Sequence, residues 1–161
     1  MPIIRLVTEI NAPLERCFNL ARSVDLHKLS TGGTREEAVA GITSGLIGMG
    51  EEVTWEATHF WIRQRLSSRI TAYQYPVSFR DEMIEGTFKK IKHDHRFEEV
   101  NGRVYMNDRF EFKSPMGLLG ELVNVLLLTP YLRRLLEKRN KMIKATAEGE
   151  QWKIILKQDL N

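Results

Sequence analysis

The residues around Asn101-Gly102 constrain the fold more than any other part of the chain. This dipeptide is strongly favoured in two-residue turns between antiparallel strands. A turn centred here pairs opposite charges on one face of the hairpin, where Lys92 meets Glu111 and Asp94 meets Arg109. A slip of one residue would turn every side chain to the other face and lose both pairs, so the pattern predicts a single register.

A second hairpin, turning near Gly86, continues the same register and again brings opposite charges together on the outer face. The inner face of these three strands is apolar except at its centre. There Asp81 is expected opposite His93, and His95 opposite Asp108. An apolar concave sheet with a few polar groups at its centre is typical of a ligand pocket.

Composition is that of an ordinary globular chain and argues against several functions. A length of 161 residues, with 42% hydrophobic and 28% charged residues, favours one domain with a sizeable core. We expect this domain to span residues 1–149, followed by a C-terminal tail at residues 150–161. The net charge of +3, without a basic stripe of interleaved aromatics, argues against nucleic acid.

The single cysteine, Cys17, excludes an internal disulfide and fits a reducing compartment, so a cytoplasmic location is expected. The N-terminus has no secretory h-region. The most apolar run, at residues 118–132, contains charge and proline and is too short to span a bilayer. We therefore expect no stable membrane insertion.

Periodicity predicts the order of the remaining elements. Alternation indicates strands at residues 4–10, 35–42, 51–59 and 65–73, and helical spacing indicates short helices from Pro13 and over residues 24–29. Residues 116–147 follow a helical stripe that Pro130 should kink or split. The tail is either a docked segment or a disordered end. One strand, two short helices, six meandering strands and a long helix match the α+β helix-grip fold, in which a curved seven-stranded antiparallel sheet wraps around the C-terminal helix.

Several segments resemble the START/polyketide-cyclase superfamily (SRPBCC), and in particular its bacterial branch of uncharacterised ligand-binding proteins. The resemblance covers about residues 2–147. It implies the helix-grip fold with a cavity between sheet and helix, and the superfamily includes lipid carriers, hormone receptors and polyketide cyclases. The motifs that carry it are VTWEATHF at 53–60, RLSSRIT at 65–71, FRDEM at 79–83, GTF at 86–88, HDHRF at 93–97 and SPMG at 114–117.

We therefore expect the protein to bind or carry a small hydrophobic or amphipathic molecule, such as a lipid, a polyketide or an aromatic compound. Aromatic and aliphatic side chains would form the walls, and the histidines and aspartates would orient one polar group. The candidate binding residues are Trp55, Phe79, Asp81, Met83, His93, His95, Phe97, Met106, Asp108 and Phe110.

The histidine–aspartate pairs leave other interpretations open. They can be structural hydrogen bonds that hold the sheet's curvature. In an enzyme of the cyclase or dehydratase type, His95 would be the general base and Asp108 would orient it. His93 and His95 with a carboxylate could also bind a metal, but direct hydrogen bonds between them would occupy the ligand atoms. No metal or cofactor is therefore expected.

The segment Phe60-Trp61-Ile62 forms an apolar tip, expected near the cavity opening together with Leu46, Ile47 and Met49. Such a tip usually contacts a partner. Gating, lipid contact and a homodimer are the alternatives here. A further hypothesis is an interaction protein with a filled cavity, docking through the kinked helix and the tail.

Overall fold

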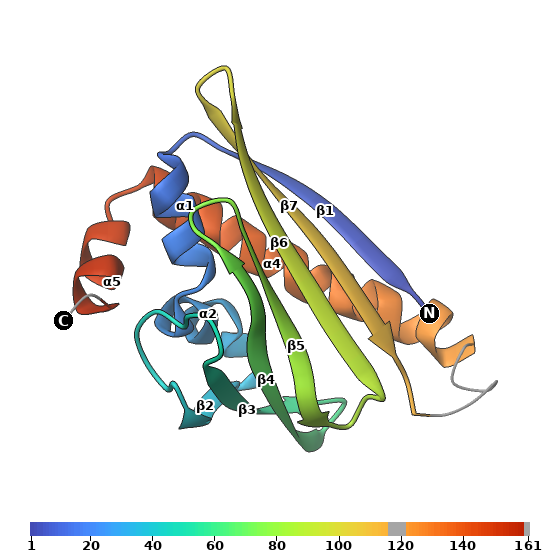
Figure 1. The fold of residues 1–161 in the computed structure, drawn as a ribbon. Coiled ribbons are helices and arrows are strands. Elements are labelled where there is room, and N and C mark those ends of the chain that lie inside the picture. Colours follow the sequence, from blue (N-terminus) through green and yellow to red (C-terminus); the bar gives the residue numbers. More distant parts are fainter. Residues whose placement is uncertain (116–121, 160–161) are drawn as a thin grey trace.

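The computed structural model describes residues 1–115 and 122–159, and its architecture is the helix-grip fold expected from the sequence (Figure 1). One antiparallel sheet has the strand order β1-β7-β6-β5-β4-β3-β2. A long helix, α4, lies across its concave face, with α1 and α2 beside it. The elements are β1 (Ile3–Ile10), α1 (Leu14–Ala21), α2 (Val24–Ser30), β2 (Glu37–Gly41), β3 (Glu52–His59), β4 (Ile62–Gln74), β5 (Ser78–Gly86), β6 (Lys90–Val100), β7 (Arg103–Lys113), α4 (Thr129–Glu148) and α5 (Trp152–Asp159).

The predicted register of the central strands is confirmed. In the β6–β7 hairpin, His95 lies opposite Asp108, and in the β5–β6 pair Asp81 lies opposite His93. Asn101 and Gly102 form the turn, and both have positive φ angles, of 51° and 76°. The face that carries the histidines is the inner one, because His95 and Asp108 are 2% and 3% exposed.

The β3–β4 connection is a tight turn at Phe60 and Trp61, and β4 begins at Ile62, earlier than expected. Both turn residues have left-handed backbones, with φ angles of 50° and 63°. Two-residue hairpin turns of this type usually carry asparagine or glycine, which adopt positive φ at little cost. Trp61 is 95% exposed, whereas the Phe60 ring lies 4.7 Å from that of Tyr131 on α4.

The sequence predicted that Pro130 kinks or splits the C-terminal helix; the helical region instead runs on from residue 122 to 148 and changes from π-helical to α-helical geometry just before Pro130. The α-helix α4 begins at Thr129, with Pro130 in its first turn, and a π-helical turn at Asn124–Leu128 precedes it. A proline cannot donate the usual hydrogen bond to the preceding turn, so a local change of helical geometry next to it is expected. The first residues of the expected helix, 116–121, lie outside the described part of the chain.

Two separate apolar clusters fill the space between sheet and helices. The larger one packs the inner face of the sheet against α1, α2, α5 and the C-terminal half of α4, with Phe18 and Phe97 almost fully buried. The smaller one lies toward the start of α4, around Phe110 and Phe112, with Leu132 and Leu136 packed against it. The histidine–aspartate residues belong to neither cluster.

The tail contains a helix, α5, that packs against α1 (Figure 1). Ile155 and Leu156 are each 8% exposed and join the larger apolar cluster. The Arg16 guanidinium lies 3.8 Å from the centre of the Trp152 ring, a cation–π contact. The sequence left open whether the tail is a docked segment or a disordered end, and these contacts correspond to a docked segment. The domain boundary at residue 149 stays a prediction.

Candidate functional site

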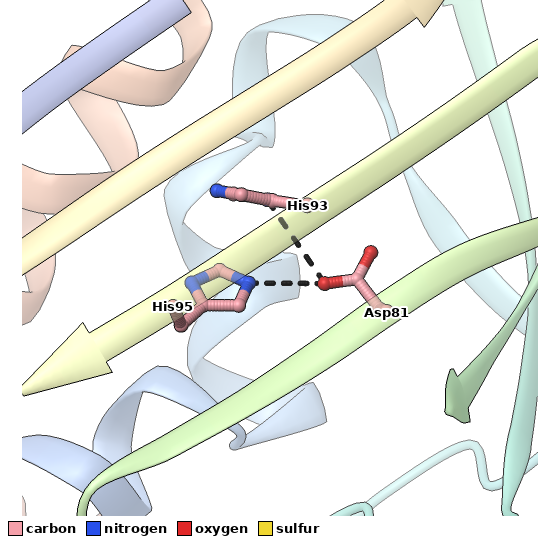
Figure 2. A group of neighbouring side chains, drawn as sticks. All are labelled: Asp81, His93 and His95. Carbon is pink, nitrogen blue, oxygen red and sulfur yellow. Dashed lines mark hydrogen bonds and ion pairs between the residues drawn. The ribbon is translucent and has the colours of Figure 1, made fainter. Parts of the chain in front are cut away.

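The two histidines and two aspartates form a compact cluster, but they bond diagonally rather than straight across the strands. His95 Nε2 lies 3.0 Å from Asp81 Oδ2, and His93 Nε2 lies 2.9 Å from Asp108 Oδ1. Figure 2 shows the His95 ring on β6 directed at the Asp81 carboxylate on β5, with the His93 ring beside it and its Nδ1 4.0 Å from Asp81 Oδ2. Diagonal neighbours on a sheet face are within reach of long side chains. We call these four residues the central cluster.

Helix α4 completes the central cluster with two polar residues that the sequence did not single out as functional. Asn140 Nδ2 donates to Asp108 Oδ2 at 2.7 Å. The Arg139 guanidinium lies 3.8 Å from Asp108 and donates to the Ala21 carbonyl at 2.8 Å. Arg139 falls on the apolar stripe of its helix, and a buried charge at such a position was the signal available in the sequence.

One polar atom of the central cluster has no hydrogen bond. His95 Nδ1 lies 2.9 Å from Asp108 Oδ1, but the two atoms are not aligned for a bond. A buried polar atom without a partner costs free energy. This atom faces Asp108 on the side of the ring away from Asp81, and the charge of the carboxylate offsets part of that cost.

The partners set the protonation of the cluster. Burial would raise the pKa of Asp108, but the imidazoles of His93 and His95 outweigh it and hold that pKa well below its usual value. Burial would also raise the pKa of Asp81, yet the same two rings lower it overall. Both aspartates are therefore carboxylates near neutral pH.

The two histidines shift in opposite directions. Burial and the neighbouring His95 lower the pKa of His93. Burial would lower the pKa of His95 too, but the carboxylates of Asp108 and Asp81 raise it overall. Of the two rings, His95 therefore holds a proton more readily, and His95 and Arg139 are the cationic partners that the two carboxylates have within the cluster.

A cavity of about 230 Å³ lies between the sheet and α4, beside the central cluster. Asp81 keeps 27% of its side-chain surface exposed although protein surrounds it, because that surface faces the cavity. The apolar walls include Trp55 and Ile70 from the sheet and Leu136 from α4. All four histidines of the chain line this space: His27, His59, His93 and His95.

The predicted binding residues divide into two groups. The cavity is lined by Trp55, Phe79, Asp81, His93, His95 and Phe110. The other four lie behind its wall: Phe97 and Met106 in the larger apolar cluster, Met83 against the smaller one, and Asp108 beneath the histidines.

Sequence reasoning also missed a second set of polar residues around the cavity. Glu36, just before β2, lies 3.1 Å from His27 Nε2. His59, at the end of β3, lies 2.7 Å from the Tyr131 hydroxyl through its Nδ1. Gln64 on β4 lines the same region. These residues are far apart in the sequence and come together only because α2, the edge of the sheet and α4 converge here.

The central cluster also offers ligand atoms to a metal. One atom each from Asp81, His93 and His95 lies within 4.8 Å of the others. However, His95 Nε2 and His93 Nε2 already bond to carboxylates. A metal would have to replace these hydrogen bonds, so the site as formed suits hydrogen bonding better than metal binding.

No protein-family model matches the chain, and no curated protein matches it in sequence. Solved structures do match. TTHA0849 from Thermus thermophilus is 18% identical, with a TM-score of 0.70 over 91% of this chain and 99% of that chain. Ginseng major latex-like protein 151 from Panax ginseng is 16% identical, with a TM-score of 0.67 over 92% and 98%. CV1439 from Chromobacterium violaceum is 12% identical, with a TM-score of 0.68 over 92% and 98%.

At these identities the matches show a shared fold, found in both bacterial and plant proteins. That fold is the one implied by the resemblance to the START/polyketide-cyclase superfamily. Fold alone does not determine chemistry. Among the described helices, none is long and apolar enough to cross a membrane.

Proposed function

We propose that this protein, as a member of the ligand-binding branch of the START/polyketide-cyclase superfamily, binds a small, largely apolar molecule in the cavity. The observation that carries the proposal is the Asp81 carboxylate, whose pKa is lowered and which faces a mainly apolar cavity. Apolar pockets with a few convergent polar groups are the usual form of a small-molecule site. Asp81 would accept a hydrogen bond from the ligand, and Arg139, which also lines the cavity, would donate one.

The size of the cavity narrows the class of ligand. Its volume of about 230 Å³ is below the roughly 300–1,000 Å³ of ordinary ligand pockets. A compact aromatic or polyketide-like compound fits this volume better than an extended lipid chain does. The cavity also favours ligand binding over the alternative of an interaction protein with a filled core.

Two measurements test the binding proposal. Organic extraction of the purified protein, followed by mass spectrometry, should release a compound of this class. Added para-phenylphenol should bind with one-to-one stoichiometry in calorimetry. Ala57→Phe, which fills the cavity from β3, should abolish that binding, whereas Val39→Phe on the exposed side of β2 should not. The proposal would be contradicted by a protein that carries no compound and whose Ala57→Phe variant binds para-phenylphenol as well as the wild type does.

A catalytic role is the second candidate, and the opposite pKa shifts of the two adjacent histidines favour it. Such pairs often separate into an acid and a base. Here His95, beside Asp108, would exchange a proton with the ligand, with His93 as its partner. The sequence suggested His95 as a general base, whereas its raised pKa suits an acid. Incubating the extracted compound with fresh protein tests this. Turnover that is unchanged in His95→Gln and Asp108→Asn would rule it out.

A further inference from the structure

The cavity has polar residues at two separate places, and the second is not part of the histidine–aspartate arrangement described above. We call Glu36, His59 and Gln64 the distal polar group. All three line the cavity. They come from the segment before β2, the end of β3 and the start of β4, whereas the central cluster occupies β5, β6 and β7.

Glu36 supplies a negative charge to the distal polar group. Its side chain is 13% exposed, and its Oε1 lies 3.1 Å from His27 Nε2. Burial would raise the pKa of Glu36, but His27 outweighs it and lowers the pKa overall. Glu36 is therefore an ionised carboxylate at the cavity wall, able to accept a hydrogen bond from a ligand.

His59 and Gln64 add polar atoms that protein groups leave unused. Burial lowers the pKa of His59, so its ring is neutral. Its Nδ1 is bonded to Tyr131, and none of the described residues bonds to its Nε2. The side-chain amide of Gln64 likewise has no hydrogen-bond partner within residues 1–115 and 122–159, although it lines the cavity. Both side chains are only partly buried, and polar groups in a cavity without protein partners are suited to a ligand or to water.

The two polar places are separated by an apolar wall. Asp81 lies on β5 and His59 on β3, with β4 between them. Along β4, Asp81 lies opposite Ile70, and Gln64 lies six residues before Ile70. At about 3.3 Å per residue, the two places are roughly 20 Å apart along the backbone, and side chains from both reach into the cavity. Leu66 and Ile70 of β4 and Trp55 of β3 line the cavity and are apolar.

We infer that the ligand is a flat, largely apolar molecule with a hydroxyl or amino group at each end. One end would donate a hydrogen bond to Asp81 in the central cluster, and the other would donate to Glu36 in the distal polar group. An aromatic or alicyclic diol or amino alcohol meets this description. The inference rests on the proposed binding function, because it specifies the chemistry of the molecule in the same cavity.

A biphenyl series tests the inference. Biphenyl, para-phenylphenol and para,para′-biphenol share one apolar frame and carry no, one and two hydroxyl groups. In calorimetry the diol should bind the wild-type protein about tenfold more tightly than the monophenol, since a hydrogen bond to a charged group contributes this much. Glu36→Gln should remove most of that difference. The matched control is Glu37→Gln, because Glu37 is the neighbouring glutamate and is exposed.

Gln64→Leu provides a second variant that does not disturb a protein hydrogen bond. It should weaken diol binding about threefold and leave monophenol binding unchanged, as expected for one neutral hydrogen bond. Circular dichroism establishes that each variant is folded.

The histidine side chains give a readout that does not depend on affinity. Because all four line the cavity, their ring Cε1–H signals in NMR spectra report on it directly. The monophenol should shift the signals of one polar place, either His93 and His95 or His27 and His59. The diol should shift both sets.

The outcomes separate the two proposals. If the monophenol binds but the diol binds no better and Glu36→Gln has no effect, the two-ended ligand is wrong and the binding function stands. If none of the three compounds binds and no histidine signal moves, the cavity does not take this class of ligand and both proposals fail.

Discussion

The Asp108 carboxylate organises the interior of this protein. It is 3% exposed and accepts hydrogen bonds from His93 on the same sheet and from Asn140 on α4. The guanidinium of Arg139 lies 3.8 Å away. Removing one partner of a buried ion pair is costly, because the other charge is left buried without compensation. Asp108 should therefore matter to stability more than any charged residue on the outer face.

Asp108→Asn should lower the free energy of unfolding by about 3 kcal/mol at neutral pH, because it leaves the buried groups of His95 and Arg139 with only the Asp81 carboxylate as counter-charge. Urea unfolding measures this. The outer-face control, Asp94→Asn, breaks ion pairs with Arg80 and Arg109 and should cost less than about 1 kcal/mol. Equal losses of unfolding free energy in the two variants would show that Asp108 contributes no more to stability than an outer-face carboxylate does.

The difference between wild type and Asp108→Asn should also depend on pH. The pKa of Asp108 is lower in the folded protein than its ordinary value of 3.8. A carboxyl group whose pKa is lower in the folded than in the unfolded protein stabilises the folded state at pH values above the unfolded pKa. This stabilisation is lost as the pH falls through the folded pKa. The stability difference should therefore be full at about pH 5 and above and shrink below about pH 4. A difference that grows on acidification would argue against this role.

At the scale of elements, the β3–β4 turn carries backbone strain at Trp61. Its φ of 63° is in the left-handed region, and its side chain is 95% exposed. A side chain there gains little packing to offset the strain. The left-handed conformation costs a residue with a Cβ about 1–2 kcal/mol.

Replacing Trp61 with glycine should therefore stabilise the protein relative to replacement with alanine, by about 1 kcal/mol. The alanine variant is the matched control, because both changes remove the indole and only glycine relieves the strain. Thermal unfolding of the two variants gives the comparison. A glycine variant that is no more stable than the alanine variant would show that the turn is relaxed as it stands.

Elements could be predicted from the sequence where several local signals agreed. Contacts that depend on how α4 or the edge of the sheet packs could not be predicted. The register of β5, β6 and β7 followed from the Asn101-Gly102 turn and the cross-strand charges. The diagonal exchange of partners between His93 and His95 could not be predicted, because it depends on side-chain rotamers. The position of Glu36 was equally hidden, since it precedes a short edge strand and meets His59 only in three dimensions.

The site was predictable in part for the same reason. Alternation along the strands placed Asp81 and His95 on the inner face correctly. It could not separate residues that line a cavity from those behind its wall, such as Met106, because both point inward. Arg139 lay on an apolar helical stripe. A polar residue in such a stripe indicates a buried partner, but the partner lies on another element.

At the scale of the whole molecule, the sheet is unevenly supported. β6 and β7 lie inside the sheet, pair along eleven residue positions and bury His95 and Met106 beneath the helices. β2 is a five-residue edge strand whose register shifts between Ala38 and Ala40. Local opening is easiest where few buried contacts hold the backbone.

Amide hydrogen exchange should therefore be slowest in the β6–β7 hairpin and fastest in β2. We expect the exchange rates of His95 and Ala40 to differ by at least about a hundredfold under native conditions. NMR-detected exchange measures both amides in one experiment. Comparable protection in the two strands would mean that the sheet opens as one cooperative unit.

The separation of the interior into two apolar clusters has a consequence for how this protein can change over evolutionary time. Leu132 and Leu136 line the cavity and belong to the smaller cluster, whereas the larger one holds most of the buried hydrophobic side chains. Substitutions at these two leucines would alter the shape of the chamber at little cost to the rest of the architecture. The cavity can thus change shape through these two positions on α4 while the larger cluster keeps its packing.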